Sequence, residues 1–221
     1  MLRVIIWKEI KETIRDRNML SSALSVTLFM VMLNMTAFRQ LIANLETFVL
    51  YMAPCIGVLV GFSLSYRFTR EKQEGTIETL LCTPLTLKEL WLSKVIGLTI
   101  PSYVVTLATV TILILIRGHG IEETVAVYIL LVIPMFIASA IGLLGYLQYV
   151  LGMKQVQMLN YVVFFTLFAI LYAVVRKLSL ETTTISWSNI CLALMLPLII
   201  LTTTYYLVAR LSKEKIILTI N

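Results

Sequence analysis

The chain has 221 residues, of which 59% are hydrophobic and only 14% are charged. Soluble domains contain about 25% charged residues, so this composition argues against a soluble fold and indicates a membrane protein. The formal net charge is +6. The basic residues gather in segments predicted to lie on one side of the membrane, so their excess indicates topology and gives no reason to expect nucleic-acid binding.

Residues 1–17 are predicted to form an amphipathic helix. Apolar residues recur at every fourth position, at Leu2, Ile6, Ile10 and Ile14. Basic and acidic residues form separate rows, so we expect this helix to lie in the membrane interface with its apolar stripe in the lipid. A plain cytoplasmic extension of the first membrane helix is the alternative.

Residues 18–221 are predicted to form one membrane domain with six transmembrane helices, which makes the chain an all-α membrane protein. The prediction rests on six long segments without a charged residue. Each is long enough to cross a hydrocarbon core of about 30 Å as a helix. The predicted spans are 19–38, 47–66, 95–116, 125–147, 156–175 and 190–209.

The distribution of basic residues predicts the orientation. Of the 18 Lys and Arg residues, 14 lie in the N-terminal segment, the second and fourth loops and the C-terminal tail. Cytoplasmic segments carry the excess of basic residues, so we expect both termini in the cytoplasm. The chain is therefore predicted to be a multi-pass protein of the inner or plasma membrane, surrounded by membrane lipid.

The second predicted span carries a row of small side chains at every fourth position. Close backbone approach across small residues is a main source of helix association in lipid, so this row is predicted to be a packing face. The sequence leaves open whether the partner helix belongs to the same chain or to a second copy. The row consists of Ala53, Gly57, Gly61 and Ser65.

Tryptophan and proline mark further features of the spans. Trp7 and Trp91 are expected at the inner lipid–water boundary and Trp187 at the outer one, where amphipathic rings are enriched. Four prolines fall within predicted spans and are expected to kink or break their helices. These prolines are Pro54, Pro101, Pro134 and Pro197.

The spans contain few candidates for a polar pathway. Asn34 and Asn160 are the amides farthest from the predicted span ends. A polar side chain in hydrocarbon needs a partner, so each is expected either to bond to another helix or to contact cargo. No cofactor or metal is expected, because the cysteines are isolated and His119 stands alone.

The loop at 67–94 carries most of the functional signal. Its start is predicted to be helical, with an apolar patch, a row of glutamates, and ion pairs from Arg67 to Glu71 and from Arg70 to Glu74. Thr86 and Glu89 form a capping-box pattern for the next helix. A solvated amphipathic hairpin is the structural alternative. The patch is Ile77, Leu80 and Leu81, and the glutamate row is Glu71, Glu74 and Glu78.

This loop resembles the signature loop of ABC-2-type transporter permeases over about 25 residues. The resemblance rests on a glutamate, a Gly-Thr-Ile-Glu run, two leucines, a proline and a final Lys94. The residues that carry it, and that it assigns to ATPase coupling, are Arg70, Glu71, Glu74, Gly75, Thr76, Ile77, Glu78, Leu80, Leu81 and Pro84.

The resemblance implies a function and partners. The loop would form a cytoplasmic coupling helix between spans 2 and 3 that docks on a separate ATP-hydrolysing ABC subunit, and the chain would be the permease of an exporter. A second permease copy or a homologue would complete the pathway as a dimer. The chain has no GxxxxGK[ST] phosphate loop, so it is not expected to be an enzyme itself.

Two other classes of protein compete with the transporter interpretation. An intramembrane enzyme acting on lipids needs ionisable or metal-binding residues near the membrane, and none of the six predicted spans has a charged side chain. A membrane scaffold without a transport role leaves the loop motif unexplained.

Overall fold

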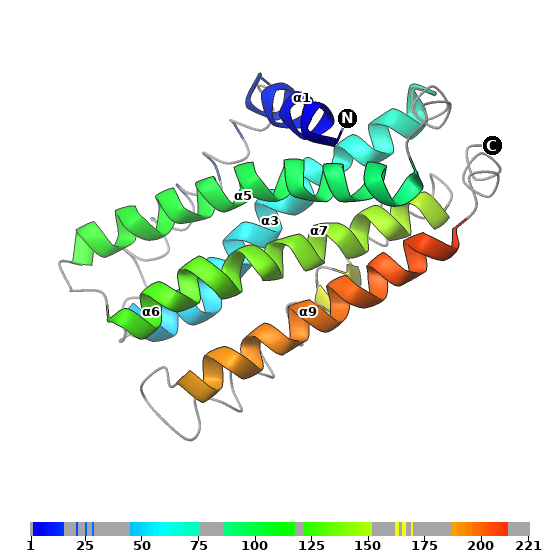
Figure 1. Cartoon of the computed structure of the whole chain (residues 1–221). Helices are drawn as coiled ribbons and strands as arrows, with labels where there is room; N and C mark the ends of the chain where they lie inside the picture. Colours follow the sequence, from blue (N-terminus) through cyan, green and yellow to red (C-terminus); the bar gives the residue numbers. More distant parts are fainter. Residues whose placement is uncertain are drawn as a thin grey trace.

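The structure is a computed structural model, and every element in the part of the chain that it describes is helical (Figure 1). It describes residues 2–15, 45–75, 86–117, 122–151 and 187–211, with residues 21, 25, 28, 162, 163, 165, 166 and 169. The elements are α1 (Leu2–Arg15), α3 (Leu45–Gln73), α5 (Leu87–Arg117), α6 (Glu123–Val127), the π-helix η2 (Tyr128–Val132), α7 (Ile133–Val150) and α9 (Trp187–Arg210).

Four long helices form a bundle, and α1 lies across it near one end (Figure 1). Gly57 and Gly61 of α3 face Ile137 and Ile141 of α7 in the same order, so these two helices run in the same direction. Gly57 and Gly61 also face Thr106 and Ser102 of α5. Because this order is reversed, α5 runs in the opposite direction to α3. The C-terminal ends of α3, α7 and α9 therefore meet the N-terminal end of α5 beside α1. We call this the α1 end of the bundle.

Three helical segments among the described residues are long and apolar enough to cross a membrane: Leu87–Ile112, Glu123–Val150 and Ile190–Arg210. They match three of the six predicted spans, and the predicted six-span count is not supported. The predicted span 47–66 lies within α3, which is not one of the three. Most of the predicted spans 19–38 and 156–175 lies outside the described residues.

The row of small side chains on α3 packs against helices of the same chain. A Cβ atom at Gly57 would lie 2.6 Å from Cγ1 of Ile137 and 3.0 Å from the Thr106 hydroxyl of α5. One turn later, a Cβ at Gly61 would lie 3.0 Å from Cγ1 of Ile141. The two ends of the row are also completely buried: Ala53 and Ser65 have no exposed surface. The row is thus a packing face inside the bundle.

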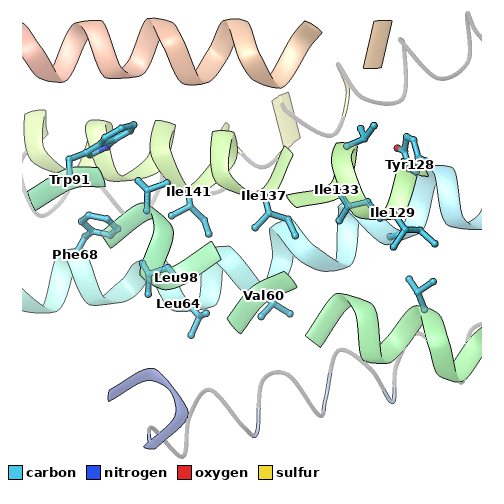
Figure 2. Close-up of a cluster of buried hydrophobic side chains, with 14 of the residues drawn as sticks. Val60, Leu64, Phe68, Trp91, Leu98, Tyr128, Ile129, Ile133, Ile137 and Ile141 are labelled. Carbon is cyan, nitrogen blue, oxygen red and sulfur yellow. The ribbon is translucent and has the colours of Figure 1, made fainter. Parts of the chain in front are cut away.

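Large apolar side chains fill the space that these small residues leave. Figure 2 shows Ile133, Ile137 and Ile141 along one side of α7, beside the ribbon of α3. All three are completely buried. Ile137 and Ile141 fill the space beside Gly57 and Gly61, and α7 also packs against α5 and α9, so α7 is the centre of the described bundle.

The prolines affect their helices unequally. Pro54, Pro101 and Pro197 lie inside helices that continue through them. Pro134 follows the π-helix η2 directly, at the start of α7. Proline has no backbone N–H to donate to the carbonyl four positions earlier, and its ring crowds that carbonyl. The wider π turn makes room for the ring. The helix thus departs from α geometry just before Pro134, but it continues through this proline without a break.

Exposed aromatic residues lie near both ends of α9. Trp187 is exposed at one end, and Tyr205 and Tyr206 are exposed at the α1 end. Eighteen residue steps in an α-helix span about 27 Å, close to the ~30 Å of a hydrocarbon core. The expectation for Trp91 was wrong, because its ring is completely buried and its Nε1 donates a hydrogen bond to the Gly142 carbonyl at 3.2 Å.

The contact between α3 and α7 makes a prediction about stability. Gly57→Ala should lower the free energy of unfolding by about 1–3 kcal/mol, because the new methyl overlaps Ile137 in a filled core. Adding Ile137→Ala should recover part of that loss, although Ile137→Ala alone leaves a cavity. Thermal unfolding of the purified chain in detergent measures both effects.

Thr203→Ala on the exposed side of α9 is the control, because its hydroxyl bonds only to carbonyls of its own helix. Strictly additive effects of Gly57→Ala and Ile137→Ala would show that the two positions do not compete for the same space.

Candidate functional site

The C-terminal end of α3 and the turn that follows it carry four of the residues predicted to couple to a partner: Arg70, Glu71, Glu74 and Gly75. Arg70 Nε donates to a carboxylate oxygen of Glu74 at 2.7 Å, which confirms the predicted pair. Gly75 has a φ of 68°, and glycine adopts this left-handed conformation without strain where a helix ends. Glu71 lies deeper. The helices also reach into the predicted loop 67–94, because α3 ends at Gln73 and α5 begins at Leu87.

The remaining predicted site residues lie outside the described part of the chain. For the loop these are Thr76, Ile77, Glu78, Leu80, Leu81 and Pro84, and for the pathway Asn34 and Asn160.

Glu71 pairs with a residue of its own chain. Its carboxylate accepts a hydrogen bond from Lys94 Nζ of α5, and the two side chains form an ion pair. Lys94 is only 3% exposed, and its Nζ also lies 5.1 Å from the centre of the Phe68 ring. A buried ammonium group needs a compensating charge, and Glu71 supplies it. This carboxylate therefore holds α3 to α5 inside the chain.

Arg67 connects α3 to α1. Its guanidinium lies 3.4 Å from a carboxylate oxygen of Glu9 and 3.8 Å from one of Glu12. The predicted local pair with Glu71 is replaced by this contact between distant segments. Glu9 is buried because α1 approaches α5 closely: a Cβ at Gly97 would lie 2.8 Å from Cβ of Glu9.

Lys72 caps the end of α7. Its Nζ donates to the backbone carbonyls of Gln148 at 3.1 Å and Leu151 at 2.8 Å. The last carbonyls of a helix have no partner within it, and a cation is favourable there because of the helix dipole. Burial lowers the pKa of the Lys72 ammonium from its ordinary value. The two carbonyls favour its charged form in return.

The start of α5 is fixed by the predicted capping box, which is confirmed. The Thr86 backbone N–H donates to a carboxylate oxygen of Glu89 at 2.9 Å, and the Glu89 N–H donates to the Thr86 hydroxyl at 3.3 Å. This reciprocal pair satisfies two donors that a helix N-terminus leaves open. The helix that carries Lys94 and Trp91 thus begins at a defined point.

Together these contacts join α1, α3, α5 and α7 at one end of the bundle. The described residues include no cluster of His, Cys, Asp or Glu that could hold a metal ion. Sequence reasoning missed Glu9 and Lys72 as members of this group, and only their position close to apolar segments could have indicated burial.

Comparison with known proteins places most of the chain in a described family. A family described as a membrane protein of 12 TMs matches residues 1–210. No curated protein and no solved structure matches the chain.

The match corrects the resemblance to ABC-2-type transporter permeases. The family that covers almost the whole chain is the 12-TM family, and the ABC-2 family does not match. The physical reason lies in the extent of the motif: about 25 residues of charged helix end, glycine and proline describe a helix–turn–helix connection, which other membrane proteins also need.

The buried ion pair makes a prediction that separates it from surface pairs. Lys94→Met should lower the free energy of unfolding by about 3 kcal/mol, because it leaves the partly buried Glu71 carboxylate without its partner. The double variant Glu71→Leu with Lys94→Met should recover most of this loss, because no charge then remains to be compensated. Chemical unfolding in detergent gives both values.

Arg70→Gln is the matched control, because the Arg70–Glu74 pair is exposed and such pairs contribute about 0.5 kcal/mol. A loss for Lys94→Met no larger than that of the control would contradict a structural role for the buried pair.

Proposed function

We propose that this chain, which belongs to the family of membrane proteins of 12 TMs, is a transport subunit that forms half of a substrate pathway. The proposal starts from its character as a helical, multi-span membrane protein. The family description names twelve spans, and the sequence predicts six. A second copy or a homologous unit completes the set in this proposal.

The packing of the described helices supports a pathway between two units. Side chains of α5 and α7 occupy the space beside Gly57 and Gly61, where a Cβ atom would already overlap them. The hydroxyls of Ser102 and Thr106 that face this contact bond to carbonyls of their own helix. The described α3, α5 and α7 therefore act as one packed wall, and cargo moves along its outer surface against the second unit.

The observation that carries the proposal is the continuity of α3. This helix of 29 residues has the exposed Arg70–Glu74 pair near one end and the close contacts at Gly57 and Gly61 in its middle. A displacement of the exposed end is transmitted directly to the neighbouring helices, because Glu71 joins α3 to α5 and Lys72 joins α3 to α7. We propose that a separate ATP-hydrolysing subunit causes that displacement.

The orientation in this proposal places the α1 end in the cytoplasm. Most of the basic residues described near the membrane boundary lie at this end, and cytoplasmic segments carry the basic excess. Arg67, Lys72 and Lys94 belong to it, together with the basic residues of α1. The ATP-hydrolysing partner is then on the side where ATP is available.

Reversing the exposed pair tests the docking site. The double variant Arg70→Glu with Glu74→Arg keeps an ion pair on α3 but inverts the charges that a partner meets. We expect the wild-type chain, purified from its native membrane in mild detergent, to retain an ATP-hydrolysing protein. The reversed variant should lose at least nine-tenths of that ATPase activity at an unchanged unfolding temperature.

Glu122→Lys with Glu123→Lys is the control, because both residues are exposed at the opposite end of the bundle. Equal retention of ATPase activity by the reversed variant and the wild type would reject α3 as the docking site.

The orientation has its own test. With Cys82 and Cys191 replaced by serine, a cysteine at Glu74 should be protected from a membrane-impermeant thiol reagent added to intact cells, and a cysteine at Glu122 should react. Cys55 is buried and should stay silent. Labelling after membrane permeabilisation is the control for both sites, and the opposite pattern in intact cells would reverse the topology.

A further inference from the structure

The rotation of α1 about its own axis is fixed by its contacts with the bundle. Glu9 and Thr13, one turn apart, are its most buried residues. Glu9 lies against Gly97 and its carboxylate pairs with Arg67, while the Thr13 hydroxyl donates to the Glu9 carbonyl at 2.6 Å. The opposite side of α1 therefore faces away from the described bundle.

That outer side has an apolar flank and a basic flank. Trp7 is 68% exposed and Ile14 is 61% exposed, and the two lie within one row of the helix. Lys11 and Arg15 form the adjacent row and are exposed. An aromatic and a branched aliphatic side chain directly beside two basic side chains form the pattern of a helix that lies in a lipid–water interface.

The acidic residues of α1 do not neutralise the basic flank. Glu9 and Glu12 pair with Arg67, and Glu12 also lies 3.7 Å from Lys8. Within the described part of the chain, Lys11 and Arg15 take part in no salt bridge. The contacts that hold α1 to the bundle thus pair its glutamates with basic residues and leave Lys11 and Arg15 facing outward.

We propose that α1 binds the surface of a membrane rich in anionic phospholipid. Trp7 and Ile14 enter the boundary between head groups and acyl chains, and Lys11 and Arg15 contact the head-group phosphates. The exposed Tyr205 and Tyr206 of α9 mark the lipid boundary at the same end of the bundle. Each basic residue close to an anionic surface strengthens binding about fivefold, so the two together contribute about 25-fold.

An acidic surface of a protein partner is the alternative occupant, and the apolar flank argues against it. Trp7 and Ile14 lie on the exposed side of α1, where a bilayer offers hydrocarbon and phosphate side by side. This proposal is independent of the transport function, because it concerns how the chain meets lipid and requires no second protein.

Hydrogen–deuterium exchange of the full chain in lipid nanodiscs tests the proposal. We expect amides of residues 2–15 to exchange at least threefold more slowly in nanodiscs with 30% phosphatidylglycerol than in pure phosphatidylcholine. The difference should shrink as salt is raised, because exposed charges are screened. Lys11→Gln with Arg15→Gln should remove the difference while the exchange of α5 and α7 stays unchanged.

Lys88→Gln is the matched control, because it removes an exposed basic residue outside α1 and should keep the difference. Trp7→Ser should raise exchange of α1 in both membranes. Equal exchange of α1 in the two lipid compositions would overturn the proposal, and so would an unchanged difference in the Lys11→Gln, Arg15→Gln variant. Either result would mean that α1 is held by the bundle and by apolar contacts alone.

Discussion

The close approach of α3 to α7 is the constraint on which the described bundle depends. Lipid is as apolar as a leucine side chain, so helices in a membrane gain little from hiding apolar surface and must gain from contact instead. Gly57 and Gly61 allow that contact, and Ile137 and Ile141 of α7 fill the space beside them. With α3 fixed against α7, the polar side chains at the C-terminal end of α3 arrive at the partners that neutralise them.

Those partners explain why charged residues can be buried at the α1 end. A pair such as Glu71–Lys94 is weak evidence for stability, since desolvation cancels much of the attraction. Its value lies in specificity, because each charge accepts only one arrangement of its helix. Lys72 at the end of α7 and Arg67 beside α1 act in the same way. The network thus defines the relative height and rotation of four helices, which a smooth apolar contact would leave free to slide.

Sequence reasoning reached the features that depend on neighbours along the chain. The long apolar segments, the small-residue row, the Arg70–Glu74 pair and the Thr86–Glu89 capping box were all predicted, because their spacing follows from helix geometry. Features decided by distant segments were not. Arg67 contacts Glu9 of α1 in place of the adjacent Glu71, and Trp91 turns into the bundle to reach Gly142. The family was also misassigned, because the assignment relied on one short segment.

The π-helix before α7 has a consequence for the buried face of this helix. Val125, Ile129, Ile133, Ile137 and Ile141 are all buried, and each is four positions after the last. In a regular α-helix a step of four overshoots one turn by about 40°, so the first and last members would point about 160° apart. The wider turn of η2 unwinds the helix and brings them back towards one side. A strict four-residue repeat can thus serve as a single continuous seam, with the proline fixing where the unwinding occurs.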